Sequence, residues 1–527
     1  MSSERMSPFR NRWFIEGVLR TTSPLHLGDG GETPWPNRPT APGEPVVRIR
    51  TLTRDAKEKP CIPGSSLKGV LRSALRATLR TGGIESGEFE RMFGSPDPAA
   101  PDSCGGAVEF HDARVPDGFV APSFHHAPPW WDATRLSAID GGVALNPKTR
   151  TADEHKLFHC EYVPAGVEFN VSITAQNLEE TDVSLLLQAL EAFNPREDVE
   201  LADPLALGAG SQGGKGRMQW HLTAVRRLNP GPEVMAWLKD PQRSAGGSSA
   251  AQALPEEEIK RLQELKPVAV TAGSGERLVL RLKLRFTEPF LVNDPAHTLK
   301  EGAREDTPDH YPRLDAEGRP MVPESSFRGV FRAQAQRILR TLASDPEQVA
   351  APGELTQPSR DRSSALAPAD FAALSLADRI FGATGWQTPI YVSDFVASSP
   401  ADTRRQEFVA IDRFMGGSAK SMKFNAEAVA GVKPPGEAKE DQAPLPAELH
   451  GVIIVRMKAW EKAGVASPAA GLLALTLRDL LEGDVTFGFG AAKGYGACTA
   501  EFADEASRQW FQQARPGVAA LRAQLTT

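Results

Sequence analysis

The stretch Ile62-Pro63-Gly64-Ser65-Ser66-Leu67-Lys68-Gly69 decides how the chain is interpreted, because a close copy returns as Val322-Pro323-Glu324-Ser325-Ser326-Phe327-Arg328-Gly329. In each copy a proline ends an extended segment, a serine is suited to cap a helix, and apolar residues then recur at helical spacing. The sequence therefore predicts a loop, a serine cap and a helix twice, with the helices reaching Arg80 and Arg340.

Each predicted helix has an apolar face and a basic face. The inward positions are Val70, Leu71, Ala74 and Leu75 in the first helix, and Val330, Phe331, Ala335, Ile338 and Leu339 in the second. The polar positions are Lys68, Arg72, Arg76 and Arg80 in the first helix, and Arg328, Arg332, Gln336 and Arg340 in the second. Free amides at the helix start, flanking serines and a cationic face together favour binding of a phosphate backbone. These serines are Ser65, Ser66, Ser325 and Ser326. The alternative is an ordinary solvent-exposed basic face, which is the commoner explanation for a single helix of this kind.

The length and charge of the chain narrow its class. Its 527 residues exceed what one core usually holds and predict two to four domains. The net charge of −7 argues against a general polyanion binder, although clustered Lys and Arg can still line local grooves. Apolar runs are too short for a membrane helix and residues 1–12 are polar, so we expect a cytoplasmic protein without membrane attachment or a signal peptide.

The cysteines argue against a disulfide scaffold. Cys61, Cys104, Cys160 and Cys498 are scattered, without a Cys-x-x-Cys pair. This spacing also argues against a ribbon-type zinc site. A zinc cluster at His155, His159 and Cys160 is the alternative, with no further support in the sequence.

Five more features occur twice, in the same order in both halves. They are the alternating segments 13–20 and 278–286, the pairs Phe93-Gly94 and Phe381-Gly382, the strands ending in Asp112 and Asp394, the segments ending in Asp140 and Asp412, and the glycine loops around Lys215 and Lys493. The shared order indicates that one ancestral unit has been used twice. We predict a first domain at 1–225, a linker with a short helix at 226–275, a second domain at 276–506 and a helical tail at 507–527. Segments 343–369 and 433–446 are rich in Pro, Ser and acidic residues and are expected to be loop insertions.

The glycine loops differ from a nucleotide-binding loop, which needs Gly-x4-Gly-Lys followed by Ser or Thr. Ala209 stands where the first glycine belongs and Gly216 where the hydroxyl belongs, while Ala492 precedes Lys493. We instead predict turns whose amides meet a sugar-phosphate backbone. The side chains expected to assist are Lys215, Arg217, Lys493 and Tyr495. A purely structural hairpin is the alternative for either loop.

Together these motifs resemble the RAMP superfamily of CRISPR-associated proteins. The resemblance covers most of residues 12–225 and 276–503, and each half is similar to the guide-RNA backbone subunit of type III effector complexes. The tandem arrangement is most like the double subunits of subtype III-D variants. The resemblance implies an α+β fold of two tandem modified ferredoxin-like (RRM-like) domains with loop insertions. Thumb hairpins are expected around 139–158 and 411–424.

The resemblance also implies partners, namely guide RNA (crRNA), target RNA and other type III CRISPR effector subunits. In the family the thumb kinks the guide–target duplex. A methionine there can wedge between bases while cations hold phosphate. The residues carried over to this RNA-binding role are Arg48, Lys148, Arg150, Arg413, Lys420, Met422 and Lys423.

Metal-dependent cleavage of target RNA is a further implication of the resemblance. The family uses an aspartate in the loop before the Pro-Ser-Ser stretch, where a carboxylate can hold Mg²⁺ or Mn²⁺ against the phosphate. Gly43 stands at that place in the first copy, with Glu44 adjacent, whereas the second copy keeps Asp309 with Asp306 nearby. Asp309 is therefore the expected metal ligand, and we predict one active repeat. Asp55 and Asp315 are better suited to turns.

Two other functions stay open. One is a backbone subunit in which neither half cuts RNA. The other is the metal-independent guide-processing endoribonuclease branch of the superfamily, which needs a histidine for acid–base chemistry. The histidines available for it are His26, His125, His126 and His310.

Overall fold

The computed structural model describes most of the chain as an α+β protein. The described residues are 8–35, 46–80, 84–95, 103, 105–124, 126–145, 152–195, 205–211, 214–239, 251–267, 270, 277–294, 308–346, 371, 374–383, 385–434 and 443–526. Within these ranges no helix is long and apolar enough to cross a membrane.

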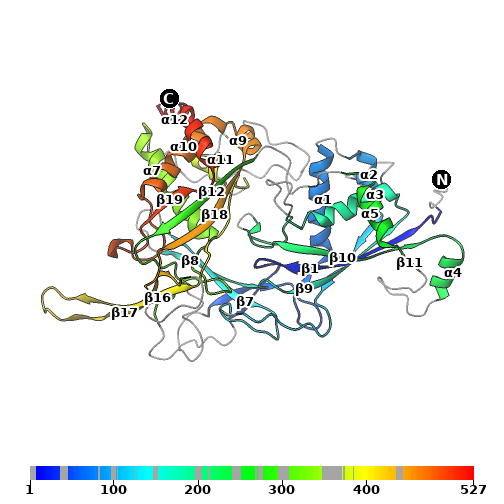
Figure 1. The fold of residues 1–527 in the computed structure, drawn as a ribbon, viewed down its shortest axis with the longest axis horizontal. Coiled ribbons are helices and arrows are strands. Elements are labelled where there is room, and N and C mark those ends of the chain that lie inside the picture. The colour runs from blue at the N-terminus through cyan, green and yellow to red at the C-terminus, as the bar shows by residue number, and fades with distance from the viewer. Residues whose placement is uncertain are drawn as a thin grey trace.

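The first half is built on one sheet with strand order β11-β10-β1-β9-β6-β4, to which β5 adds by pairing with β9. The strands are β1 (Arg12–Thr21), β4 (Cys61–Ile62), β5 (Val108–Phe110), β6 (Ala113–Arg114), β9 (Glu168–Gln176), β10 (Met218–Leu228) and β11 (Gln252–Ala253). Alternation puts Trp13, Ile15 and Leu19 of the central strand into the core. The helices α1 (Gly64–Arg80), α2 (Ser86–Phe93) and α3 (Glu180–Glu191) cover that face (Figure 1).

The second half repeats this plan with strand order β13-β15-β18-β12-β19, and β14 pairs with β18. Its strands are β12 (Arg277–Phe286), β13 (Met321–Val322), β14 (Ile390–Val392), β15 (Phe395–Ala397), β18 (Ala447–Arg456) and β19 (Cys498–Phe502). Its helices are α7 (Glu324–Leu342), α8 (Leu376–Phe381), α9 (Met457–Lys462) and α10 (Ala466–Glu482). In both halves the central strand, β1 or β12, runs antiparallel to both of its neighbours.

The predicted basic helices are present, but serines do not cap them. Both helices start directly after the proline, so the serines lie inside the first turn. The first helical amide is bonded instead by an aspartate at the end of a distant strand: Gly64 N donates to Asp112 at 2.9 Å, and Glu324 N donates to Asp394 at 2.8 Å. The serine-cap prediction is therefore wrong, because a charged acceptor already occupies the helix start.

The buried positions of both helices begin one turn earlier than predicted. Leu67 and Phe327 are fully buried, whereas Val70, Val330 and Ile338 are only partly buried.

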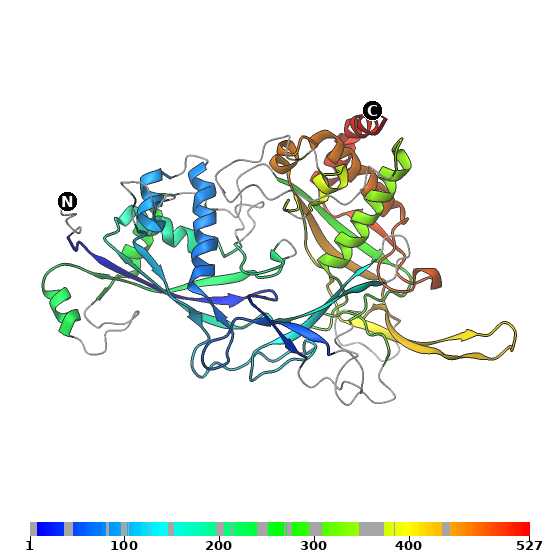
Figure 2. The same cartoon turned by 180° about the vertical axis from the view of Figure 1, so that it is seen from behind.

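Each half also carries a hairpin beyond its sheet. The first, β7 (Ala138–Leu145) and β8 (Ala152–Tyr162), joins β2 (Gly28–Pro34) and β3 (Arg48–Leu52) in a four-stranded sheet that reaches toward the second half (Figure 2). The second, β16 (Ala401–Ile411) and β17 (Ser418–Val432), projects alone from the molecule (Figure 1). It starts at Ala401, well before the predicted Ile411, because the motif ending in Asp412 lies at its tip.

Segments outside the two sheets pack against them. The linker contains α4 (Pro232–Lys239) and α5 (Glu256–Glu264), and Leu262 of α5 is buried in the core of the first half. At the C-terminal end, α11 (Glu505–Gln513) precedes α12 (Arg515–Thr526), whose Gly517 lies against Gly471 of α10 with no room for a Cβ. Part of the predicted linker thus belongs structurally to the first half.

Candidate functional site

The two glycine loops have the same backbone path. Glycines with positive φ occur at 208, 210, 214 and 216 (79°, 77°, 77° and 72°) and at 488, 490, 494 and 496 (83°, 85°, 83° and 75°). A Cβ on Gly216 or Gly496 would overlap a carbonyl oxygen of the same loop. Each loop also bonds the segment after the central strand, through Ala209 N to His26 O (2.9 Å) or Phe489 N to Leu291 O (2.7 Å). These positions require glycine for the turn itself.

This register corrects the predicted pairing of motifs. Lys215 N and Tyr495 N bond the matching glycine carbonyls, Gly210 O and Gly490 O, so Tyr495 and not Lys493 is the counterpart of Lys215. The hairpin ladders correct a second pairing. Asp140 pairs with Cys160 in the first hairpin and Gln406 pairs with Ala426 in the second, so Gln406 and not Asp412 is the counterpart of Asp140. The contact between each pair is kept: Lys215 bonds Asp140 at 3.1 Å, and the Tyr495 hydroxyl bonds Gln406.

The basic helix faces differ in how many of their cations are paired within the chain. In α7, Arg328 bonds Glu324 at 2.9 Å, and Arg332 bonds Asp378 at 2.6 Å. In α1, Arg72 lies 5.9 Å from the centre of the Phe89 ring, while Lys68 and Arg76 form no ion pair among the described residues. The exposed cationic face predicted for both helices is thus largely neutralised in the second.

Asp309 lies at the foot of the second hairpin and is fixed there by Asn425. Asp309 N donates to the Asn425 side-chain oxygen at 3.0 Å, and Asn425 N donates to Asp309 Oδ2 at 2.8 Å. Glu427, on the same face of β17, donates its amide to His310 O at 2.9 Å. Within the described residues Asp309 Oδ1 has no hydrogen-bond partner, so this carboxylate keeps a free ligand atom.

Next to Asp309 is an aromatic cluster. The His310 ring lies 4.6 Å from Phe489 and 5.7 Å from Phe424, centre to centre. Its Nδ1 is buried without a hydrogen-bond partner in the described part of the chain. Burial lowers the pKa of His310, against the attraction of Asp309, and Lys493 lowers it further. The Lys493 ammonium lies 5.0–5.4 Å from the rings of Phe408, Phe424 and Phe489. Aromatic side chains in a positively charged setting can serve as a surface on which nucleic-acid bases stack.

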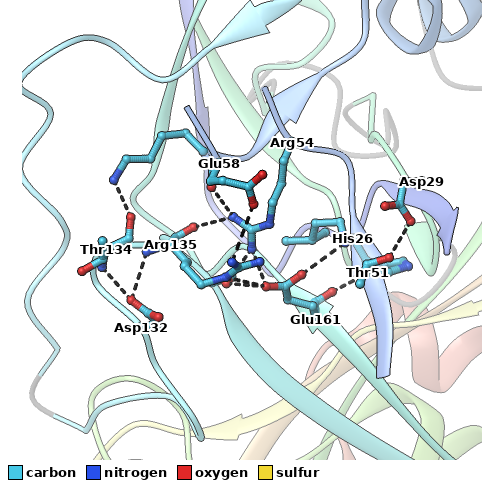
Figure 3. A network of polar contacts seen from close by, with 12 residues as sticks. His26, Asp29, Thr51, Arg54, Glu58, Asp132, Thr134, Arg135 and Glu161 are labelled. Carbon is cyan, nitrogen blue, oxygen red and sulfur yellow. Dashed lines mark hydrogen bonds and ion pairs between the residues drawn. The ribbon is translucent and has the colours of Figure 1, made fainter. Parts of the chain in front are cut away.

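Glu161 occupies in the first half the position that Glu427 has in the second. Arg54 pairs with the Glu161 carboxylate (Figure 3). Ser137 donates to the same carboxylate at 2.8 Å, and Leu52 N donates to it at 3.2 Å. Both charged side chains of that pair are buried, 9% exposed for Arg54 and 7% for Glu161.

Among the described residues, Glu427 keeps only the hydrogen bond that corresponds to the one from Ser137. Thr403 donates to Glu427 at 2.6 Å. Leu314 stands where Arg54 is in the first half, and Pro312, which has no amide hydrogen, stands where Leu52 is. Carboxylate oxygens are the ligands that Mg²⁺ and Mn²⁺ prefer, so the free oxygen of Asp309 suits such an ion, whereas the neutralised Glu161 does not.

The first half also has no acidic residue at the position equivalent to Asp309. His310 and Arg50 make the matching bridges, to Ala426 and Cys160, and this register puts Ile49 at the position of Asp309. Ile49 is 2% exposed and packs with Trp35 and Ile139. Sequence reasoning placed the missing acid at Gly43 or Glu44, which lie outside the described residues, as does Asp306.

The two halves meet around Asp140, which the sequence did not single out as a contact. Arg313 of the second half bonds Asp140 at 2.6 Å, and Lys215 approaches its other oxygen. Burial opposes ionisation of Asp140, but Arg313 and Lys215 outweigh it and hold its pKa well below the usual range. Arg217 donates to the Tyr391 hydroxyl at 2.7 Å.

A second set of contacts holds the loop that follows Asp309. His126 stacks on Tyr311 at 6.2 Å and donates its amide to Ala316 O at 2.8 Å. The loop with the candidate acid is therefore anchored on the first half.

The remaining predicted residues are scattered. Arg48 and Arg413 are exposed, on β3 and at the tip of the second hairpin, and Lys423 pairs with Glu407 at 2.7 Å. Lys148 and Arg150, and the side chains of Lys420, Met422 and His155, lie outside the described residues. Burial raises the pKa of the Cys160 thiol, and it raises that of Cys61 to about 11 and that of Cys498 to about 12. Such thiols suit packing better than zinc binding.

Comparison with known proteins identifies the family. Residues 18–219 and 262–499 each match the profile of the RAMP superfamily, so the two matches follow the two halves of the structure. A comparison with curated proteins gives no match. Because the family matches span most of the chain, this protein belongs to the RAMP superfamily and is a CRISPR-associated RNA-binding subunit.

Proposed function

We propose that the chain is a double guide-RNA backbone subunit of a type III CRISPR effector complex, most like those of subtype III-D. Each half would be a modified ferredoxin-like domain with its hairpin acting as the thumb on the guide–target duplex. The matching strand orders, the shared glycine loops and the two family matches support this assignment. Guide RNA, target RNA and other effector subunits are the partners it requires.

We further propose that the second half cuts target RNA and the first does not. The observation that carries this proposal is the contrast between Asp309, exposed with a free carboxylate oxygen, and Ile49, buried in an apolar cluster at the same backbone position. Glu427 adds to the contrast, because it lacks the arginine that neutralises Glu161.

The residues of the second half have separate tasks in this mechanism. Asp309 would hold a divalent ion, which when bound would polarise the phosphate and favour attack by a ribose hydroxyl. Asn425 fixes the orientation of Asp309 through two hydrogen bonds. The Phe424 and Phe489 rings offer a stacking surface for a displaced base, with Lys493 to attract its phosphate.

The contacts between the halves prepare this geometry before RNA arrives. Tyr311 and Arg313, which follow Asp309 in the chain, are held by His126 and Asp140 of the first half. A catalytic loop fixed on both sides loses little conformational freedom on binding, and such preorganisation favours the reaction.

Cleavage of end-labelled target RNA by the assembled complex tests this function. We expect cutting with Mg²⁺ or Mn²⁺, none with chelator, and loss of one cut in Asp309→Asn with guide RNA still bound. Cutting that survives chelation would favour the histidine mechanism, for which His310 with its unpartnered Nδ1 is the better placed candidate, since His26 Nδ1 lies 2.6 Å from Glu161 O. Target that stays intact with the unmodified complex would favour a purely structural subunit.

A further inference from the structure

The charged part of the junction between the two halves can be compared with the outer faces of the same chain, because the residues that meet around Asp140 and Tyr391 each have a counterpart in the other half. On the first-half side the junction uses Asp140, Lys215 and Arg217. On the second-half side it uses Arg313 and Tyr391. A second copy of the chain, joined in the same way, would bring the counterparts of these five residues together.

The outer face of the second half has lost the charges of the junction. Gln406 replaces Asp140, Tyr495 replaces Lys215, and Ala497 replaces Arg217 in the aligned strands and loops. The Tyr495 hydroxyl bonds Gln406, so this face offers a neutral hydrogen-bonded pair where the junction offers a carboxylate.

The outer face of the first half has changed as well. The backbone amide of Thr53 donates to Leu27 O and that of Arg313 donates to Val292 O, each at 2.8 Å. Leu27 and Val292 both follow the central strand of their half, so Thr53 is the counterpart of Arg313. Glu109 on β5 is the counterpart of Tyr391 on β14 by its position in the ladder. Its side chain is 68% exposed, although it lies 3.8 Å from Arg12 of the same half.

We propose that these replacements prevent the chain from binding a second copy of itself. They leave the outer face of the second half for a different protein, one that has no cation at the position equivalent to Arg313. A copy docked there would set Thr53 against Gln406 and desolvate Glu109 against Ala497, with no ion pair gained. An arginine there would in turn lack a carboxylate partner, which is costly when it is desolvated.

The second hairpin supports an external occupant on this face. The first hairpin reaches toward the second half of the same chain, whereas the second one extends into open space (Figures 1 and 2). Its tip presents Phe414, 99% exposed, and Met415, 84% exposed. The loss of the junction charges disfavours a second copy of the chain as the protein that covers this face. This inference rests on the repeated architecture and not on the proposed cleavage.

Introducing the junction residues on the outer faces of the full-length chain tests whether the replacements prevent self-association. A donor variant carries Gln406→Asp and Ala497→Arg, and an acceptor variant carries Thr53→Arg and Glu109→Tyr. Sedimentation velocity should show the unmodified chain and each variant alone as single chains, and their mixture as a complex of two chains that dissociates at high salt. High protein concentration is needed, because only the internal junction benefits from the roughly millimolar effective concentration given by a linker.

A matched control reverses one sign, with Thr53→Asp in place of Thr53→Arg in the acceptor variant, and its mixture with the donor should stay as single chains. Circular dichroism and the thermal midpoint establish that every variant is folded. Two results would overturn the proposal. One is concentration-dependent self-association of the unmodified chain that Gln406→Arg abolishes. The other is a folded donor and acceptor that do not associate in the mixture.

Discussion

Glu161 in the first half and Glu427 in the second occupy the same strand position, yet Glu161 is buried against Arg54, whereas Glu427 accepts a hydrogen bond from Thr403. The neighbouring position shows the same divergence, from Ile49 to Asp309. By contrast, the eight positive-φ glycines and the aspartates at the two helix starts are kept in both halves. Residues that the backbone path requires are the same in both halves, whereas residues that determine the local chemistry differ between them. A repeated fold therefore need not carry a repeated functional site.

The largest effect on stability is expected from Arg54→Ala. It should lower the free energy of unfolding by about 3–5 kcal/mol, because Glu161 would be left as a buried charge without its partner. Urea unfolding measures this change. Arg135→Ala is the control, since Arg135 is half-exposed and 3.7 Å from the same carboxylate, and should cost less than about 1 kcal/mol. Glu427→Gln should also cost about 1 kcal/mol or less. An equal cost for Arg54→Ala and Glu427→Gln would contradict the difference between the two glutamates.

The next largest effect is expected where the halves are alike. Gly216→Ala and Gly496→Ala should each cost about 2–4 kcal/mol, because alanine would combine a strained positive φ with a backbone clash. Thermal unfolding provides the measurement. Gly69→Ala and Gly329→Ala are matched controls in helices with open space around the new Cβ, and should stabilise by about 0.5–1 kcal/mol. A tolerated Gly496→Ala beside a damaging Gly216→Ala would mean that the loops are not equivalent.

A moderate, pH-dependent effect is expected at the junction. The pKa of Asp140 is lowered by Arg313 and Lys215 despite burial, so its ionised form stabilises the folded state. That contribution is fully present above the unfolded pKa of about 3.9 and is lost as pH falls below it, toward the lower folded pKa. Asp140→Asn should therefore cost about 2 kcal/mol at neutral pH and progressively less below about pH 4. Thermal midpoints of both proteins across this range provide the test, and a constant difference would refute the assignment.

The smallest effect is expected on guide-RNA affinity. Lys68→Ala with Arg76→Ala should weaken binding and reduce the slope of log affinity against log salt by about 0.7 for each lost phosphate contact. Arg328→Ala with Arg332→Ala should change the slope less, because both arginines already bond acids within the chain. Equal slope changes for the two pairs would show that the internal ion pairs open on RNA binding.

Local patterns were sufficient to predict much of the fold. Alternating apolar residues predicted the central strands, the Pro-Ser-Ser stretches predicted α1 and α7, and repeated order predicted the duplication. The register inside the hairpins was not predictable in this way. Asp412 shares its local sequence with Asp140 but lies at a hairpin tip, because the second hairpin is longer. Likewise a nearby serine suggested the helix caps, although Asp112 and Asp394 bond the first amides from far along the chain.

The candidate site was predictable only in part for the same reason. Asp309 could be proposed from its place before the second Pro-Ser-Ser stretch. Its hydrogen bonds with Asn425, the pairing of Arg54 with Glu161, and the contact of Arg313 with Asp140 all join residues far apart in sequence. No local pattern encodes such pairs, and they are what distinguishes the two halves.

The most direct test of the central claim is the length distribution of end-labelled target RNA fragments, cut in the assembled complex with Mg²⁺ or Mn²⁺. Asp309→Ala should remove one cut completely while guide and target remain bound, whereas Asp306→Ala and Glu44→Ala should leave the pattern unchanged. An unaltered pattern in Asp309→Ala, or the loss of the cut in Asp306→Ala instead, would contradict the assignment of cleavage to Asp309.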